Sequence, residues 1–184
     1  MRILIDMDGV IADFDQEFLQ RWRERHPEKP YIPLEERTTF YVKDSYPEAL
    51  QSFVAEILLE ESFFREMIPV PGAKEALEEM VTKGFEVFIC ASPLSTYGNC
   101  VVEKYEWVEK YLDPSWVNKI ILTKDKTVIK ADFLIDDKPE ITGVEKEPGW
   151  EHILYDRPYN RDIKRRRLTW ETWKDVIPSS SQEL

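Results

Sequence analysis

Cysteine is scarce in this chain, which has only Cys90 and Cys100 among its 184 residues. Two cysteines are too few to cross-link a chain of this length, so the sequence argues against a disulfide-stabilised secreted scaffold. No run approaches the roughly 18 consecutive apolar residues of a membrane span, and the start of the chain lacks the pattern of a signal peptide. We therefore expect reduced thiols, a cytoplasmic location and no membrane partner.

Basic residues are fewer than acidic residues in this chain. The chain has 25 lysine and arginine residues against 36 aspartate and glutamate residues, which gives a net charge of −11. This balance argues against a surface for polymeric nucleic acid or anionic lipid, so an anionic ligand would have to be held by local charge. The one basic run, Lys164 to Arg167, is interpreted as a solvated face without a functional role.

Apolar runs rich in β-branched residues alternate with helical patterns along the chain. The expected strands are Ile3 to Ile5, Val87 to Cys90, Ile120 to Leu122, Phe133 to Ile135 and His152 to Tyr155. Helical stripes begin near Phe14, Ala73 and Val101. This order predicts an α/β fold, a Rossmann-like doubly wound parallel sheet with helices on both faces, in which ligands bind at the carboxyl ends of the strands.

One segment breaks the alternation. Residues from about 31 to 67 show no clear strand, one helical stretch from Pro47 to about Glu61, and several aromatic residues. We expect a small, mostly helical cap subdomain there, inserted after the first strand and helix. The length predicts that residues 1–184 otherwise form a single domain.

Two acidic residues follow the first strand, in the sequence Asp6-Met7-Asp8-Gly9-Val10. Residues two apart in a strand point to the same side, so Asp6 and Asp8 can meet at the sheet edge, where Mg²⁺ would relieve their repulsion. A calcium loop is excluded because Val10 occupies a ligand position and Ile11 stands where the turn needs glycine. A turn with two solvated acids stays open at this point.

Polar side chains follow three more of the expected strands. Asp136 and Asp137 come after one strand, Lys126 lies in the polar stretch after another, and Ser92 follows Cys90. Each of these positions taken alone is also compatible with an ordinary solvated turn or surface lysine. Together they bring acids, an ammonium group and a hydroxyl to one edge of the sheet.

Phosphoryl transfer is the chemistry that uses such a set. One carboxylate attacks phosphorus, a second carboxylate moves the proton, Mg²⁺ neutralises phosphate oxygens and an ammonium group stabilises the charge. The residues therefore predict Asp6 as the nucleophile, Asp8 as the acid and then the base, and Lys126 as the stabilising cation.

These residues resemble the motifs of the haloacid dehalogenase-like phosphatases, and the chain further resembles the 5'(3')-deoxyribonucleotidases within that superfamily. The matching motifs are Asp6 to Val10, the region of Ser92, Lys126, and the pair Asp136-Asp137. The subfamily resemblance extends over Asp6 to Phe14, Glu103 to Tyr111, Leu122 to Thr127, Leu134 to Asp137 and Gly149 to Leu154.

The resemblance implies a Mg²⁺-dependent phosphoric monoester hydrolase of the 5'-nucleotidase type, which acts on (deoxy)nucleoside monophosphates through an aspartyl-phosphate. It implies catalytic Asp6 and Asp8; magnesium ligands Asp6, the backbone carbonyl of Asp8, and Asp137, with Asp136 in support; phosphate ligands Ser92 and Lys126; and a base and sugar pocket of Phe14, Phe40, Tyr41 and Val42. It also makes a homodimer an expectation.

Two positions depart from the family pattern. Ala91 stands where the family has a phosphate-binding threonine, and Leu58 stands where the animal enzymes place an aromatic residue in the cap. These departures leave open a phosphatase for another small phosphate ester. A non-catalytic nucleotide-binding protein would have lost Asp6, Asp8, Lys126 or Asp137, and all four are present. Carbon–halogen cleavage needs neither a proton donor at Asp8 nor a magnesium site.

Overall fold

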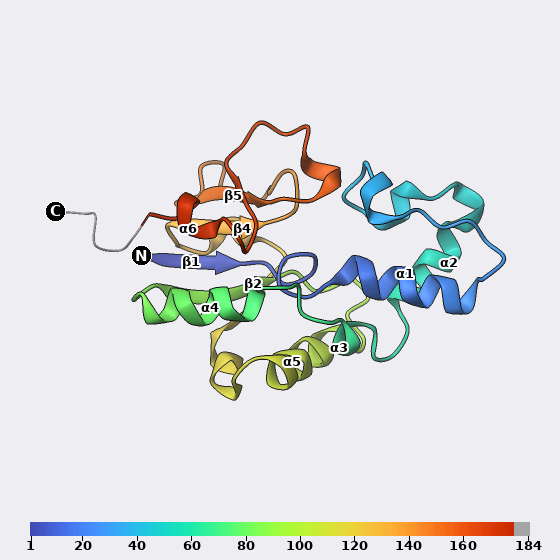
Figure 1. The fold of residues 1–184 in the computed structure, drawn as a ribbon, viewed down its shortest axis with the longest axis horizontal. Coiled ribbons are helices and arrows are strands. Elements are labelled where there is room, and N and C mark those ends of the chain that lie inside the picture. Colours follow the sequence, from blue (N-terminus) through green and yellow to red (C-terminus); the bar gives the residue numbers. More distant parts are fainter. Residues whose placement is uncertain (179–184) are drawn as a thin grey trace.

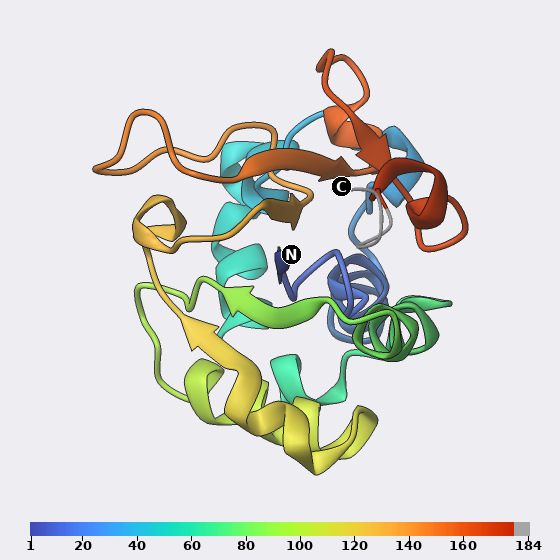
Figure 2. The same ribbon diagram turned by 90° about the vertical axis from the view of Figure 1, so that its left-hand side faces the viewer.

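The computed structural model describes residues 1–178, which contain a six-stranded parallel sheet (Figures 1 and 2). The strands are β1 (Arg2–Ile5), β2 (Glu86–Ala91), β3 (Ile120–Leu122), β4 (Phe133–Asp136), β5 (Glu151–Tyr155) and β6 (Arg167–Leu168). Their order is β3-β2-β1-β4-β5-β6, so β1 lies at the centre between β2 and β4. The predicted α/β fold with a Rossmann-like parallel sheet is confirmed.

Helices and short 3₁₀ turns connect these strands. The α-helices are α1 (Phe14–Arg25), α2 (Gln51–Leu58), α3 (Phe63–Glu66), α4 (Ala73–Thr82), α5 (Cys100–Tyr111) and α6 (Trp173–Val176). The 3₁₀ turns are η1 (Leu34–Glu36), η2 (Val42–Ser45), η3 (Glu48–Leu50), η4 (Pro114–Lys119), η5 (Lys126–Val128) and η6 (Pro158–Asn160). Within the described residues, no helix is both long and apolar enough to cross a bilayer.

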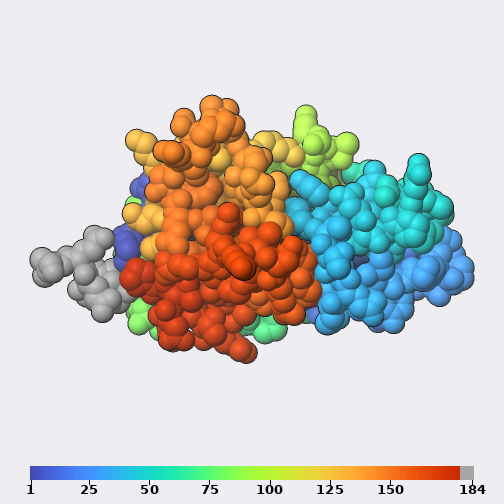
Figure 3. Space-filling model, turned by 90° about the horizontal axis from the view of Figure 1, so that it is seen from above, coloured from blue at the N-terminus to red at the C-terminus, as the bar shows by residue number. Residues whose placement is uncertain are grey.

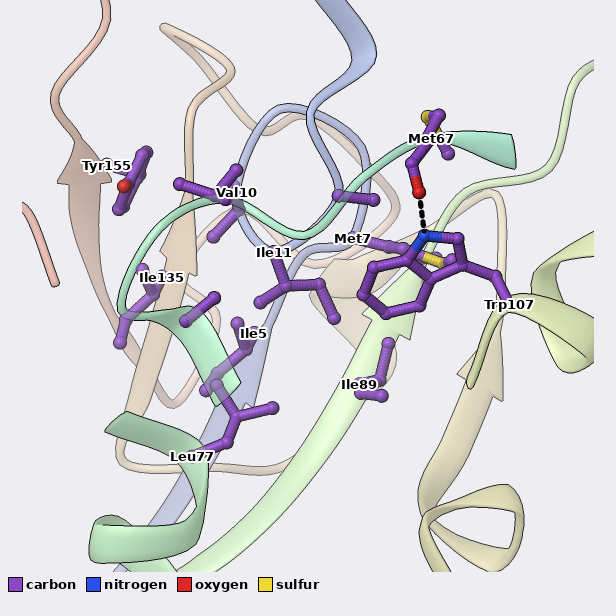
Figure 4. Close-up of a cluster of buried hydrophobic side chains, with 14 of the residues drawn as sticks. Ile5, Met7, Val10, Ile11, Met67, Leu77, Ile89, Trp107, Ile135 and Tyr155 are labelled. Carbon is purple, nitrogen blue, oxygen red and sulfur yellow. Dashed lines mark hydrogen bonds between the residues drawn. The ribbon is translucent and has the colours of Figure 1, made fainter. Parts of the chain in front are cut away.

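The main hydrophobic core lies between the sheet and its helices. Side chains of Ile5, Ile89 and Ile135 from three neighbouring strands gather near Leu77 of α4, with Trp107 of α5 beside them (Figure 4). The indole of Trp107 is fully buried and donates a hydrogen bond of 2.7 Å to the Met67 carbonyl, which ties α5 to the segment that follows α3. This packing fixes the carboxyl ends of the central strands relative to the helices.

The opposite face of the sheet is covered differently from the prediction of helices on both faces. Leu4 and Leu134 point to this face and pack with Trp150, Ile129 and Ile141, which come from the segments between β3 and β5. Those segments contain the 3₁₀ turn η5 and no α-helix. The stretch between β3 and β4 is too short for a full crossover helix, so loops and one tryptophan cover this face instead.

Helix α1 begins where the sequence predicts, but it packs with the cap. The Asp13 carboxylate accepts a hydrogen bond from the backbone N–H of Gln16 and so caps the first turn. The ring centroids of Trp22 and Tyr46 lie 4.5 Å apart, and the ring of Phe18 contacts the same tyrosine. In Figure 1, α1 and α2 lie together at one end of the molecule, beyond the ends of the strands, and Figure 3 shows the lighter blue and cyan residues at the same end. The segment from about residue 31, which we expected to form the cap, therefore packs against α1.

Helix α5 and the basic run also differ from expectation. The predicted apolar stripe of this helix comprised Val101, Tyr105, Val108 and Leu112, and only Val108 and Leu112 are buried. The rest of the buried face is formed by Cys100, Glu103, Lys104 and Trp107. The basic run is structural, because its arginines donate to backbone carbonyls and to carboxylates such as those of Glu151 and Asp156. The last residue of the run, Arg167, begins β6, which the sequence analysis did not predict.

Candidate active site

The loop after β1 brings two acids to the edge of the sheet in a fixed conformation. Asp6 continues the sheet pairing, because its N–H donates to the Ile135 carbonyl at 2.9 Å. Gly9 has a positive φ of 80°, and a Cβ at this position would lie only 2.4 Å from Oδ2 of Asp137. Glycine is therefore required on two grounds, the left-handed backbone and the close approach of the second acidic strand end.

Lys126 joins the first and fourth motifs. Its ammonium lies 2.6 Å from Oδ1 of Asp6 and 2.6 Å from Oδ2 of Asp136, and the side chain is buried. Burial alone would lower the pKa of Lys126, but the attraction of Asp136 and Asp6 outweighs it and raises this pKa. The lysine is consequently a permanent cation at the bottom of the site. The lysine and the two strand ends lie together as the sequence predicts.

Asp137 has one engaged and one free carboxylate oxygen. Its Oδ2 accepts a short hydrogen bond from the hydroxyl of Tyr159, whereas Oδ1 is buried without a hydrogen-bond partner. Burial and the neighbouring charges of Asp136 and Asp6 raise the pKa of Asp137 well above its ordinary value. A buried acceptor with no donor is the expected environment of a ligand for a cation.

Three carboxylates converge closely enough to share a metal ion. One ligand oxygen from each of Asp6, Asp136 and Asp137 lies within 4.8 Å of the others. An all-oxygen donor set of this kind suits a hard cation such as Mg²⁺. The Asp8 carboxylate is not part of this cluster, so a ligand from Asp8 would have to come from its backbone carbonyl.

The Asp8 carboxylate instead pairs with Lys104, which the sequence analysis did not assign to the site. Nζ of Lys104 lies 2.5 Å from Oδ1 of Asp8, and the lysine is completely buried on α5. Burial raises the pKa of Asp8, while Lys104 opposes the increase. A charged residue in line with the buried Cys100 and Trp107 of one helix face is the signal that could have identified Lys104.

The second-motif position provides a hydroxyl at the edge of the site. Ser92 is exposed, and its Oγ donates to the Thr123 carbonyl at 2.9 Å. Ala91 is buried at the end of β2 and offers no side-chain polar group. The Ser92 hydroxyl has one proton, so it would have to release the Thr123 carbonyl in order to donate to an anion.

All ten predicted site residues line one cavity of about 440 Å³. The polar ones are Asp6, Asp8, Ser92, Lys126, Asp136 and Asp137, and the apolar ones are Phe14, Phe40, Tyr41 and Val42. Leu58 lies among the lining residues, together with the unpredicted Arg37, Lys138 and Tyr159. The cavity thus has a polar end formed by strand termini and an aromatic wall formed by α1 and the cap.

The cap wall is held in place by a buried arginine. Arg37 pairs with Asp15 of α1, and both side chains are about 4% exposed. The same guanidinium donates to the backbone carbonyls of Thr39 and Phe40. These bonds fix the loop that carries Phe40 and Tyr41. Sequence reasoning missed Arg37 because its partners are distributed over two separate segments.

The fold is that of hydrolases of the haloacid dehalogenase type. A hydrolase of this type from Bacillus subtilis bound to magnesium superposes with a TM-score of 0.53, over 95% of this chain and 97% of its own. The two sequences are 12% identical, so this likeness shows the fold alone.

Closer relatives define the family. The model of the 5' nucleotidase, deoxy (pyrimidine), cytosolic type C proteins matches residues 1–182. The human cytosolic 5'(3')-deoxyribonucleotidase is 44% identical, with 97% of this chain and 94% of that protein covered. The human mitochondrial 5'(3')-deoxyribonucleotidase is also 44% identical, with coverages of 97% and 83%. The chain belongs to this family, and the predicted class of phosphoric monoester hydrolase of the 5'-nucleotidase type is confirmed.

Proposed function

We propose that this protein hydrolyses (deoxy)nucleoside monophosphates with Mg²⁺ through an aspartyl-phosphate on Asp6. One observation carries the proposal: a single cavity is lined both by the acid pair Asp6 and Asp8 and by the aromatic residues Phe14, Phe40 and Tyr41. The names of the human relatives support deoxynucleotides as substrates. An apolar sugar pocket rejects an added hydroxyl by only about 10²-fold, so we expect a partial preference over ribonucleotides.

The first half-reaction forms a bond between a carboxylate oxygen of Asp6 and phosphorus, while the bond from phosphorus to the ester oxygen breaks. Asp8 gives its proton to the departing oxygen, which leaves as the nucleoside hydroxyl. The raised pKa of the buried Asp8 favours the protonated form that this step needs. Lys104 holds Oδ1 of Asp8, so the orientation of the proton donor is fixed.

The second half-reaction hydrolyses the aspartyl-phosphate. Asp8, now ionised, accepts a proton from water as the water oxygen attacks phosphorus, and the bond from phosphorus to Asp6 breaks to release inorganic phosphate. Lys104 stabilises the ionised Asp8 in this half, because its ammonium lies 2.5 Å away. Lys126 and Ser92 would hold the phosphate oxygens.

Mg²⁺ would be held by Asp6, Asp137 and the backbone carbonyl of Asp8, with Asp136 in support. The free, buried Oδ1 of Asp137 and the oxygen-only donor set fit such an ion. When bound, the ion would neutralise charge on the phosphate oxygens and on the attacking carboxylate.

The aromatic wall would receive the base and sugar. Phe14, Phe40, Tyr41 and Val42 line the cavity, and Leu58 stands beside them in place of an aromatic residue. The smaller Leu58 leaves more room at the base, which supports a broader base preference. We also propose a cytoplasmic location, because the chain has only two cysteines and they are expected to be reduced, and a homodimer, on the basis of the family resemblance.

The test is phosphate release with and without Mg²⁺ from dUMP, dTMP, dGMP, UMP, 3'-dUMP and several sugar phosphates. The proposal predicts metal-dependent release that is highest on deoxynucleotides. Release from sugar phosphates alone would favour the second candidate, a phosphatase for another small phosphate ester. Ala91 and Leu58, which depart from the family pattern, are the reason for testing this candidate. No release from any ester would favour a nucleotide-binding protein without catalysis.

A further inference from the structure

Tyr159 contacts both the acidic end of the cavity and its aromatic wall. Its hydroxyl donates to Oδ2 of Asp137, and its ring packs edge-on against Phe40 with 6.0 Å between centroids. The side chain is 5% exposed and comes from η6, the turn that follows β5. It therefore contacts both a carboxylate of the cation site and a residue of the aromatic wall.

The turn that carries Tyr159 is rigidly attached to the ends of β4 and β5. The side-chain amide of Asn160 donates to the carbonyls of Asp137 and Tyr155, at 2.8 and 2.9 Å. Arg157 donates to the Gly9 carbonyl at 2.8 Å, which ties the same turn to the loop of the two acids. The position of the Tyr159 hydroxyl is thus fixed by the backbone of three strand ends.

The ring of Tyr159 supports the cap from the other side. The guanidinium carbon of Arg37 lies 4.6 Å from the ring centroid, and this arginine holds the carbonyls of Thr39 and Phe40. A guanidinium above an aromatic ring is attracted by the ring quadrupole. Rotation of Tyr159 would therefore disturb the Asp137 carboxylate and the aromatic wall together.

We propose that Tyr159 is a positioning residue for the cation site: its hydroxyl holds Oδ2 of Asp137 so that Oδ1 is kept as the free ligand oxygen, while its ring supports the wall of the nucleotide pocket. Without the hydroxyl the carboxylate can rotate, since Oδ1 has no protein partner to hold it. Outer-shell hydrogen bonds of this kind change metal affinity by about 10- to 100-fold. This inference rests on the magnesium site of the proposed function.

Tyr159→Phe removes the hydroxyl and keeps the ring, so it separates the two roles. We expect the dissociation constant for Mg²⁺, measured by calorimetry on the metal-free full chain, to rise about 10- to 100-fold. We expect KM for dUMP at saturating Mg²⁺ to stay within about twofold, because the ring still supports Arg37 and Phe40. Thermal unfolding verifies that the variant is folded.

Tyr46→Phe is the matched control. Tyr46 is also a buried tyrosine whose hydroxyl is hydrogen-bonded, in this case as the acceptor of the Ile32 N–H at 3.2 Å within the cap. The affinity for Mg²⁺ should be unchanged in this variant. Wild-type affinity in Tyr159→Phe would overturn the inference, as would equal losses in both variants. Failure of the wild-type chain to bind Mg²⁺ would instead overturn the magnesium site itself.

Discussion

His152 lies behind the acidic strand end in surroundings that require a neutral imidazole. Its Nδ1 lies 2.5 Å from a guanidinium nitrogen of Arg165, which can only donate, so Nδ1 is the acceptor. Nε2 then carries the proton and faces the carbonyl of Asp136 at 3.4 Å. A second proton would be placed on Nδ1 directly against the guanidinium.

The cost of that second proton predicts a pH-dependent stability. Burial, together with the charge of Arg165, lowers the pKa of His152 from 6.5 to about 4. Across this window the unfolded chain binds a proton that the folded chain does not, so the free energy of unfolding falls as pH falls from about 6.5 to about 4. At 1.36 kcal/mol per pKa unit, the loss from this single group is about 3 kcal/mol.

Urea denaturation of the wild type and of His152→Gln from about pH 7.5 to about pH 4 isolates this contribution, because other titrating groups cancel in the difference. Glutamine can accept from Arg165 and donate to the Asp136 carbonyl, but it does not titrate. The wild type should lose about 3 kcal/mol relative to this variant on acidification. His26→Gln, which leaves His152 in place, serves as the control. A difference that is independent of pH would refute the argument from burial and the guanidinium.

Three further substitutions test individual contacts. Gly9→Ala should destabilise the fold by at least about 1–2 kcal/mol, as measured by denaturation, because a Cβ would collide with Asp137 and the backbone is left-handed. Ala91→Thr should lower KM for dUMP by up to about tenfold in steady-state kinetics, because one hydrogen bond to phosphate is gained. Lys104→Met should lower kcat by about 10²-fold or more with little change in KM, since Asp8 loses the group that orients it. Equal kcat values for this variant and the wild type would remove Lys104 from the mechanism.

The sequence predicted the parts of the fold that depend on local pattern. The central strands are short apolar runs, and the Asp13 cap marks the start of α1, so these elements lie where expected. The packing of α1 with the cap was not predictable in the same way. It depends on the contact of Trp22 with Tyr46, and the sequence pattern of α1 equally suits a helix that packs on the sheet.

The same distinction applies to the site. Asp6 and Asp137 could be predicted because acids at the carboxyl ends of parallel strands must converge. Tyr159 could not, because its partner Asp137 is distant in sequence and a lone tyrosine carries no motif. For Lys104 the sequence shows a charged residue on an otherwise buried helix face, but it does not show the partner Asp8. These side chains act through tertiary contacts, which a single sequence does not display.

Phosphate release by Asp6→Asn is the most direct test of the central claim, that Asp6 is the nucleophile of a Mg²⁺-dependent phosphatase. The matched control is Asp175→Asn, the same change at an exposed position on α6. With dUMP and Mg²⁺, we predict that Asp6→Asn remains folded and releases no phosphate, while the control releases it at the wild-type rate. Near-normal release by Asp6→Asn would contradict the aspartyl-phosphate mechanism.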